Sequence, residues 1–353
     1  MKAKLGDHLD FSSGSGSPAR TSEGDIPVYG ANGPIGYATQ PNARGPLIVI
    51  GRVGSYCGSV RYCDSDVWVT DNAFVCRARN PLETRYWYYA LQTCGLNDHR
   101  AGSGQPLLNR AILRDVPVRT AAAGERQRIA GLLGALDDKI AANRRVIEAA
   151  ESLMVATAEP IDDYVPLCTL ASRSTVSLNA GEFDDYIAHF SLPAFDDHAR
   201  PQLVAAGSVR SAKFVLSGPC VLVAKLNPRI PRIWNVVSLP SEMALASTEF
   251  VVLRPRDVDT SALWSAVRQP EVLDTVAQQV AGTSGSHQRI QPRDLLDVRV
   301  RDVRRLSDAA VKTITGLGVL CHTRRTESAR LAALRDAVLP RLISGELAVR
   351  PPR

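Results

Sequence analysis

The side chains of this sequence that suit base recognition lie mostly in its loops. Arginine presents paired donors that match guanine, and asparagine or glutamine pairs a donor with an acceptor, as adenine requires. We prefer the SHQR run at 286–289. The alternatives for each candidate are a solvated loop residue or a contact to phosphate, which positions a protein without specifying a base. The candidates are Asn32, Arg52, Ser55, Tyr56, Arg61, Asn72, Gln105 and Asn109 in the first half, and Lys213, Lys225, Asn227, Arg229, Arg232, His287, Gln288 and Arg289 in the second.

Patterns that would support catalysis are missing from the sequence. The glycine-rich segments 51–54 and 102–104 do not continue into the Lys-Ser/Thr of a phosphate loop. The Asn-Pro of 226–229 lacks the aromatic residue that would stack a flipped adenine. The six histidines show no HExxH spacing, and the acidic pairs at 184–185 and 196–197 have no nuclease pattern around them. We therefore predict no catalytic or metal site, which makes a self-contained restriction or methylating enzyme the weaker alternative.

Length and charge indicate two domains and an acidic partner. The chain has 353 residues, enough for two domains of about 150 residues each plus connectors. Its net charge of +6 suits a partner that carries phosphates, although a basic surface kept for solubility gives the same number. The seven cysteines form no CxxC pair, and no apolar run has the length of a signal peptide or a membrane span. These features predict a cytoplasmic protein with free thiols.

The chain runs through one series of segments twice, in the same order. Each copy opens with a short apolar stretch, continues through two strand-like runs and a helix that contains tryptophan, and closes with a long helix. Seven matches in one order predict an internal repeat. The pairs are 4–9 with 165–170, 46–58 with 219–232, 71–79 with 247–255, the segments around Trp87 and Trp264, 101–109 with 281–291, 115–119 with 297–301, and the two closing helices.

The two closing helices have the patterns of a coiled coil. In 124–158 the apolar positions alternate spacings of four and three, with one asparagine in the series, which is typical of a coiled-coil seam; an amphipathic helix in a globular core is the alternative. The second helix begins near Ser307 as N-cap and ends at Ser344-Gly345, with a polar, arginine-rich middle. We expect the helices to pair antiparallel. The predicted seam is Ile129, Leu133, Leu136, Ile140, Asn143, Ile147, Ala150 and Met154 against Ile314, Leu317, Leu331, Leu334, Val338 and Leu342.

Three groups of residues carry a resemblance to a known family. GERQRIAGLLGALDDKIAANRR (124–145) resembles the central conserved region of the specificity subunits of type I restriction–modification systems, and 329–347 resembles their C-terminal signature. The segments 26–37, 51–58 and 221–234 resemble motifs of their target-recognition domains. The matched positions of the central region are Glu125, Gln127, Ile129, Ala130, Leu136, Asp137, Lys139, Ile140 and Asn143.

The resemblance implies a fold and a set of partners. The implied fold is α+β, with two globular α/β target-recognition domains separated by two long antiparallel helices in a coiled coil. We expect domains at 1–120 and 160–304, helices at 121–159 and 305–347, and a tail at 348–353. The implied partners are double-stranded DNA, two methyltransferase (modification) subunits and restriction/translocase subunits. No cofactor is expected in this chain; S-adenosylmethionine, ATP and Mg would belong to the partner subunits.

The resemblance also implies that each domain reads one half of a bipartite, asymmetric DNA site, with the helices as spacer. Residues Ile129 to Met154 would span roughly 39 Å at ~1.5 Å per residue. Half-sites one turn of DNA apart lie about 34–36 Å from centre to centre. The remaining alternatives are the specificity subunit of a related multi-subunit restriction/methylation system and a coiled-coil scaffold that does not bind DNA.

Overall fold

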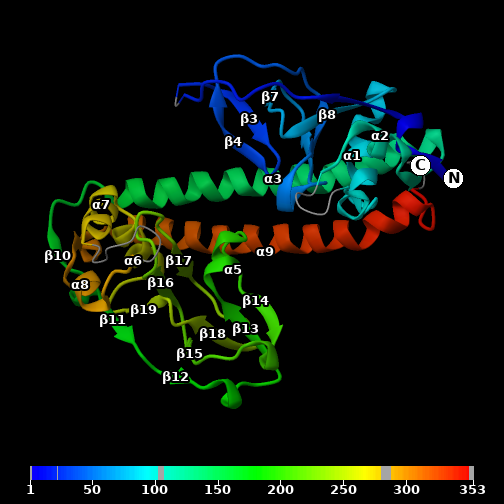
Figure 1. Ribbon diagram of the computed structural model, residues 1–353. Helices are drawn as coiled ribbons and strands as arrows, with labels where there is room; N and C mark the ends of the chain where they lie inside the picture. The colour runs from blue at the N-terminus through cyan, green and yellow to red at the C-terminus, as the bar shows by residue number, and fades with distance from the viewer. Residues whose placement is uncertain (1, 22, 102–106, 280–287, 350–353) are drawn as a thin grey trace. The chain divides into compact units, whose positions relative to one another are not determined.

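The computed structural model of the chain describes residues 2–21, 23–101, 107–279 and 288–349 (Figure 1). The chain divides into two compact units, and both long helices contribute to each. Unit 1 contains residues 1–139 and 331–353, and unit 2 contains residues 140–330. The segment boundaries expected from the sequence stay a prediction, because this division cuts each helix between the units.

Unit 1 is built on three small sheets. A four-stranded sheet has the order β2-β8-β5-β6, a three-stranded sheet has the order β4-β3-β7, and β1 pairs with β9. The strands are β1 (Lys2–Lys4), β2 (Leu9–Ser13), β3 (Ile26–Gly30), β4 (Gly33–Ala38), β5 (Leu47–Gly51), β6 (Val60–Cys63), β7 (Trp68–Val69), β8 (Ala73–Ala78) and β9 (Pro117–Arg119). The helices are α1 (Thr84–Gln92) and α2 (Arg110–Asp115), with the 3-10 turns η1 (Leu5–Asp7), η2 (Gly54–Tyr56), η3 (Pro81–Glu83) and η4 (Leu96–His99).

The core of unit 1 forms on the two faces of β5. All five residues of this strand are buried, as an apolar Leu-Ile-Val-Ile run between covered faces requires. Ile48 and Ile50 pack with Trp87 and Tyr89 of α1 on one face. Leu47 and Val49 pack on the other face with the second sheet. The end of β5 is therefore held rigidly from both sides.

Unit 2 repeats this plan with a larger second sheet. Its four-stranded sheet has the order β11-β19-β16-β17, its five-stranded sheet the order β12-β15-β18-β13-β14, and β10 pairs with β20. The strands are β10 (Tyr164–Pro166), β11 (Ala171–Ser174), β12 (Ser177–Leu178), β13 (Tyr186–Phe190), β14 (Gln202–Ala205), β15 (Lys213–Val215), β16 (Cys220–Ala224), β17 (Ile233–Val236), β18 (Met243–Ser247), β19 (Phe250–Pro255) and β20 (Arg299–Arg301). The helices are α4 (Leu167–Leu170), α5 (Leu192–Asp196), α6 (Thr260–Val267), α7 (Pro270–Gln278) and α8 (Pro292–Asp297), with η5 (Ala180–Glu182), η6 (Ala206–Ser208) and η7 (Val303–Arg305).

The predicted internal repeat is confirmed strand by strand. The order β2-β8-β5-β6 in unit 1 corresponds to β11-β19-β16-β17 in unit 2. The parallel pair β3·β7 corresponds to the parallel pair β13·β18, and β1·β9 corresponds to β10·β20. The antiparallel pair β12·β15 of unit 2 has no counterpart among the described strands of unit 1.

The two long helices begin and end close to the predicted residues. Helix α3 spans Ala123–Ala158, and Pro160 follows it. Helix α9 spans Asp308–Ser344. The Ser307 hydroxyl accepts a hydrogen bond from the amide of Ala310 at 3.3 Å, as an N-cap should. Gly345 has a φ of +81°, the left-handed conformation that ends helices.

The helices pack antiparallel along a seam with a polar centre. In unit 2 the buried Asn143 donates to Glu327 at 3.0 Å and Ser328 at 3.2 Å, and Ile147 lies opposite Cys321. In unit 1 the Arg335 guanidinium contacts Asp137 at 2.6 Å. The residue numbers of the two helices run in opposite directions through these contacts, so the predicted antiparallel arrangement is confirmed.

One predicted seam position has to be corrected. Leu334 is 51% exposed, and the neighbouring Arg335 faces α3 instead. The stretch from Cys321 to Ser328 is polar, so it contains no apolar residues from which the heptad register could be continued. The predicted seam position was therefore displaced by one residue. Leu339, Leu342 and Ile343 then bury the end of α9 in the core of unit 1.

No helix in the described part of the chain is both long and apolar enough to cross a membrane. The described residues also contain no group of three or more His, Cys, Asp or Glu side chains that could hold a metal ion.

Candidate nucleic-acid interface

The end of β5 forms a corner, which we call corner 1, from Arg52, Asn72 and Leu108. The amide of Arg52 donates to the carbonyl of Asn72 at 2.9 Å. The carbonyl of Arg52 accepts from the amide of Leu108 at 3.0 Å. The Arg52 guanidinium lies over the ring of Phe74 at 5.5 Å, and its buried Nε has no partner in the described part of the chain. Two sequence candidates, Arg52 and Asn72, therefore meet here.

The end of β16 forms corner 2 from Lys225, Glu249 and Ile290. The amide of Lys225 donates to the carbonyl of Glu249 at 2.8 Å, and the carbonyl of Lys225 accepts from the amide of Ile290 at 3.0 Å. These bonds are the same, residue for residue, as those of corner 1. The two corners also share a left-handed residue two positions on: Gly54 with φ +73° and Asn227 with φ +51°.

Corner 2 brings four sequence candidates together. The amide of Asn227 donates to the carbonyl of Gln288 at 2.9 Å, and Leu226 forms a β-bridge with Arg289. Arg289 is exposed and makes an ion pair with Glu249 at 3.1 Å. Glu249 was not predicted from the sequence. The internal repeat could have pointed to Glu249, because Glu249 occupies in corner 2 the position that Asn72, a sequence candidate, occupies in corner 1.

A second tie in each unit holds the loop after the central strand. In unit 1 the Ser59 hydroxyl donates to the carbonyl of Ala31 at 2.6 Å. In unit 2 Arg232 occupies the equivalent position, because its carbonyl accepts from Ala224 as that of Ser59 does from Gly51. The Arg232 guanidinium donates to both carboxylate oxygens of Asp196 at 2.7 and 2.9 Å. Its side chain is only 16% exposed, so Arg232 braces this loop.

Two further candidates have local structural roles. Lys213 is 6% exposed, and its Nζ donates to the carbonyl and hydroxyl oxygens of Ser211. Burial lowers the pKa of this lysine. The structure thus places Lys213 inside the five-stranded sheet and not on a surface available to a phosphate, a correction to its predicted site. Asn109 is exposed and caps α2 by accepting from the amide of Ile112 at 2.9 Å.

The remaining candidates divide between exposed and undescribed positions. Asn32, Ser55, Tyr56, Arg61 and Arg229 are exposed. Arg61, in β6, lies near the turn that contains Asn32, because a Cβ at Gly33 would lie 3.5 Å from the Nε of Arg61. Gln105 and His287 lie outside the described residues, as does Ser286 of the preferred SHQR run, whereas Gln288 and Arg289 are described.

A buried ion pair that the sequence did not reveal fastens the globular part of unit 1 to α3. Arg126 contacts Glu83 at 2.9 Å, and the two side chains are 9% and 7% exposed. The indole of Trp87 donates to the same Glu83 carboxylate at 3.1 Å, and His8 stacks on Trp87 with ring centroids 4.6 Å apart. Removing either partner would leave the other charge buried and unpaired, which is strongly destabilising.

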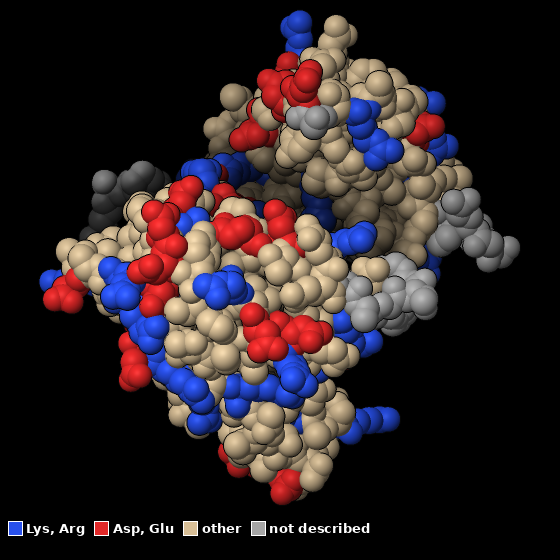
Figure 2. Space-filling view, turned by 90° about the vertical axis from the view of Figure 1, so that its left-hand side faces the viewer, with Lys and Arg blue, Asp and Glu red and all other residues tan. Residues whose placement is uncertain are grey.

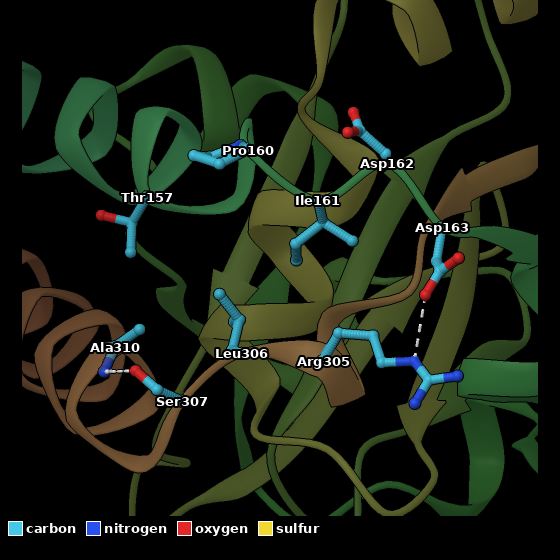
Figure 3. Close-up of a pocket in the computed structure, with 9 residues that line it drawn as sticks. All are labelled: Thr157, Pro160, Ile161, Asp162, Asp163, Arg305, Leu306, Ser307 and Ala310. Atoms are coloured by element: carbon cyan, nitrogen blue, oxygen red, sulfur yellow. Dashed lines mark hydrogen bonds and ion pairs between the residues drawn. The ribbon is translucent and has the colours of Figure 1, made fainter.

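A pocket of about 620 Å³ in unit 2 lies apart from corner 2. It is formed where α3 ends and α9 begins, and the Arg305–Asp163 ion pair at 3.2 Å stands at its edge (Figure 3). Ile161 and Leu306 give it apolar walls. No predicted base-reading residue is among those that line it.

The surface carries both signs of charge. Figure 2 shows Lys and Arg side chains in a band across the lower part of the view, below clusters of Asp and Glu. On this face both signs of charge are present, so it does not present a uniform positive field.

Comparisons of sequence identify a domain in the first half of the chain. Residues 2–152 match the family described as the type I restriction modification DNA specificity domain. The chain is 26% identical over 175 residues to the type I restriction enzyme EcoprrI specificity subunit of Escherichia coli. That match covers 49% of this chain and 42% of the relative's length.

The fold as a whole is similar to that of a solved subunit. The S subunit of the type I restriction–modification system from M. genitalium matches with a TM-score of 0.62 at 15% identity, over 97% of this chain and 96% of that one. At this identity the match shows the fold.

The two units repeat one strand order, and the two long antiparallel helices contribute to both. Residues 2–152 thus match a type I restriction modification DNA specificity domain, and the chain as a whole shares its fold with a type I S subunit.

Proposed function

We propose that the chain is the specificity subunit of a type I restriction–modification system, that each of its two units reads one half of a bipartite, asymmetric DNA site, and that it performs no catalysis itself. The observation that carries the proposal is the pair of corners. Arg52 and Lys225 have the same backbone hydrogen bonds, yet the side chains around them differ. One scaffold with two sets of polar groups suits two unlike half-sites, because base identity is read by the pattern of donors and acceptors.

The long helices would set the spacer and dock the partners. Helices α3 and α9 have 36 and 37 residues, and each belongs to both units. The proposed partners are two methyltransferase subunits, joined by restriction/translocase subunits. S-adenosylmethionine, ATP and Mg would be bound by those subunits, and the complex would act in the cytoplasm.

Footprinting tests the proposal directly. The full chain and its methyltransferase subunits are bound to a library of random duplexes, and protected bases are mapped. We expect two protected segments with an unread spacer between them. Cleavage or methylation of DNA by the isolated chain would favour a self-contained enzyme. The absence of any protected bases would favour a coiled-coil scaffold that does not bind DNA.

Inserted helical turns test the spacer. Four residues are added to α3 near Arg144, and four to the facing part of α9 near Thr326, where both helices lie outside the globular cores. We expect a longer spacer with unchanged half-sites, since each added turn lengthens a helix by about 5.4 Å. If the lengthened protein still recognised the spacer length of the parent protein, the proposal that the helices set the spacer would be contradicted.

A further inference from the structure

Arg289 is held by one edge of its guanidinium. Its Nε donates to one oxygen of the Glu249 carboxylate at 3.1 Å, and its Nη2 donates to the other at 3.2 Å. This side-on pairing uses the edge formed by Nε and Nη2. The opposite edge, formed by Nη1 and Nη2, keeps two parallel N–H groups, and Nη1 has no hydrogen-bond partner among the described residues.

The backbone beneath this arginine is fixed on both sides. Arg289 forms a β-bridge with Leu226, and the following Ile290 is 1% exposed and bonded to the carbonyl of Lys225. Glu249 is fixed in turn, because its own carbonyl accepts from the amide of Lys225 and it precedes the first residue of β19. A side chain with an anchored Cα and an anchored guanidinium loses little freedom on binding.

The arginine remains accessible despite this support. Its side chain is 44% exposed, and that of Glu249 is 32% exposed. A pair this accessible contributes little to folding stability, since exposed salt bridges are typically worth less than about 1 kcal/mol. The geometry of the Arg289–Glu249 pair is better explained by the Nη1–Nη2 edge of the guanidinium that it leaves exposed.

We propose that Arg289 recognises a guanine in the second half-site and that Glu249 is its positioning residue. The free Nη1–Nη2 edge donates two hydrogen bonds to O6 and N7 of the base, which is the commonest specific contact in the major groove. The inference rests on the proposed function and adds to it a base, an edge of the guanidinium and the carboxylate that orients it.

A similar pair in the same unit provides the control. Arg232 uses the same two nitrogens toward Asp196, but its side chain is 16% exposed against 44% for Arg289. Asp196→Asn and Glu249→Gln make the same chemical change in both pairs. The inference requires that they differ in effect on base preference.

The test measures base preference at every position of the site. The full chain with its methyltransferase subunits is incubated with a randomised duplex library, and bound molecules are sequenced for the parent and for Arg289→Lys, Arg289→Ala, Glu249→Gln and Asp196→Asn. For Arg289→Lys we expect the preference for guanine at one position of the second half-site to fall about tenfold or more. Affinity should change less, because lysine keeps the charge and loses the planar fork.

Glu249→Gln separates positioning from charge. It removes a negative charge close to the DNA, so we expect binding to unrelated duplexes to stay the same or rise. Preference for guanine at the same position should fall several-fold, and Asp196→Asn should affect that position much less.

Three outcomes would overturn the inference while leaving the bipartite footprint intact. The first is a guanine preference that survives Arg289→Lys and Arg289→Ala. The second is a preference lost in Arg289→Lys yet untouched in Glu249→Gln. The third is a change of equal size in Asp196→Asn. A parent protein without a bipartite site would instead contradict the proposed function.

Discussion

The two globular parts share a backbone plan but are fastened to their helices by different chemistry. Unit 1 uses the buried ion pair of Glu83 and Arg126. Unit 2 uses buried, uncharged groups: the amide of Gln269, 1% exposed, donates to the carbonyl of Val155 at 3.0 Å, and Ser261 packs against Gly318 of α9, while the charged contact of Arg144 with His198 is exposed. A repeat can thus keep its strand order while the parts that set stability diverge.

The largest expected effect is the loss of the buried ion pair in unit 1. Glu83→Gln leaves the Arg126 guanidinium buried without a counter-charge, and we expect it to lower the free energy of unfolding of unit 1 by about 3–5 kcal/mol. Urea unfolding followed by hydrogen exchange measures each unit separately. Gln269→Ala in unit 2 removes neutral hydrogen bonds and should cost about 1–3 kcal/mol. If Glu83→Gln and Gln269→Ala lowered the free energy of unfolding by equal amounts, the charged and uncharged contacts would not differ in their contribution to stability.

The double variant Glu83→Met/Arg126→Met is the control for this experiment. It removes both charges and keeps apolar volume next to Trp87. We expect it to recover most of the stability lost in Glu83→Gln, because no buried charge remains unpaired. A double variant as unstable as the single one would show that lost packing, not lost pairing, caused the effect.

A smaller effect, opposite in sign at two neighbouring glycines, tests the close contact in unit 2. A Cβ at Gly318 would lie 2.1 Å from the Oγ of Ser261, itself 1% exposed and bonded to Asn235. We expect Gly318→Ala to destabilise unit 2 by about 1–3 kcal/mol. A Cβ at Gly316 meets nothing within 4 Å, so Gly316→Ala should stabilise the same helix by about 1 kcal/mol. Thermal unfolding compares the two, and two stabilising substitutions would mean that α6 does not press on α9 as described.

The elements that could be predicted from the sequence are those with a regular apolar pattern. The buried runs of β5 and β16 and the apolar heptads of α3 were recognisable because a covered strand and a coiled-coil seam each impose a regular pattern. In α9 the predicted seam residue Leu334 was wrong, since the seam there is made by Arg335, whose ion pair with Asp137 has no apolar signature.

Only some residues of the candidate site could be predicted from the sequence. Arg52, Asn72 and Arg289 have side chains that suit bases, so their types pointed to the corners. Glu249 is 40 positions from Arg289 in the chain, and a carboxylate does not itself suggest guanine. Lys213 was misplaced because its charge outweighed its position as the first residue of β15. Pairing across strands is a property of the fold, and the residue types alone do not contain it.

The smallest expected effect concerns acid and again separates the units. Burial lowers the pKa of His8 in unit 1, with Arg126 and Arg79 lowering it further and Asp7 and Glu83 opposing them. Burial likewise lowers the pKa of His189 and His322 in unit 2, helped by Lys213 and Arg325 respectively. A histidine with a lowered folded pKa binds its proton more readily in the unfolded chain. Stability is therefore complete above the unfolded pKa of about 6.5 and is lost as the pH falls from there to the folded pKa.

His8→Phe keeps a ring stacked on Trp87 but removes the titrating group. We expect the loss of stability below about pH 6.5 to become shallower for unit 1 and to stay as it is for unit 2, where His189 and His322 remain. Hydrogen exchange at a series of pH values, with peptides from each unit followed separately, gives both slopes in one sample. An unchanged slope in unit 1 would assign its acid sensitivity to carboxylates, and an altered slope in unit 2 would show that the two units do not unfold independently.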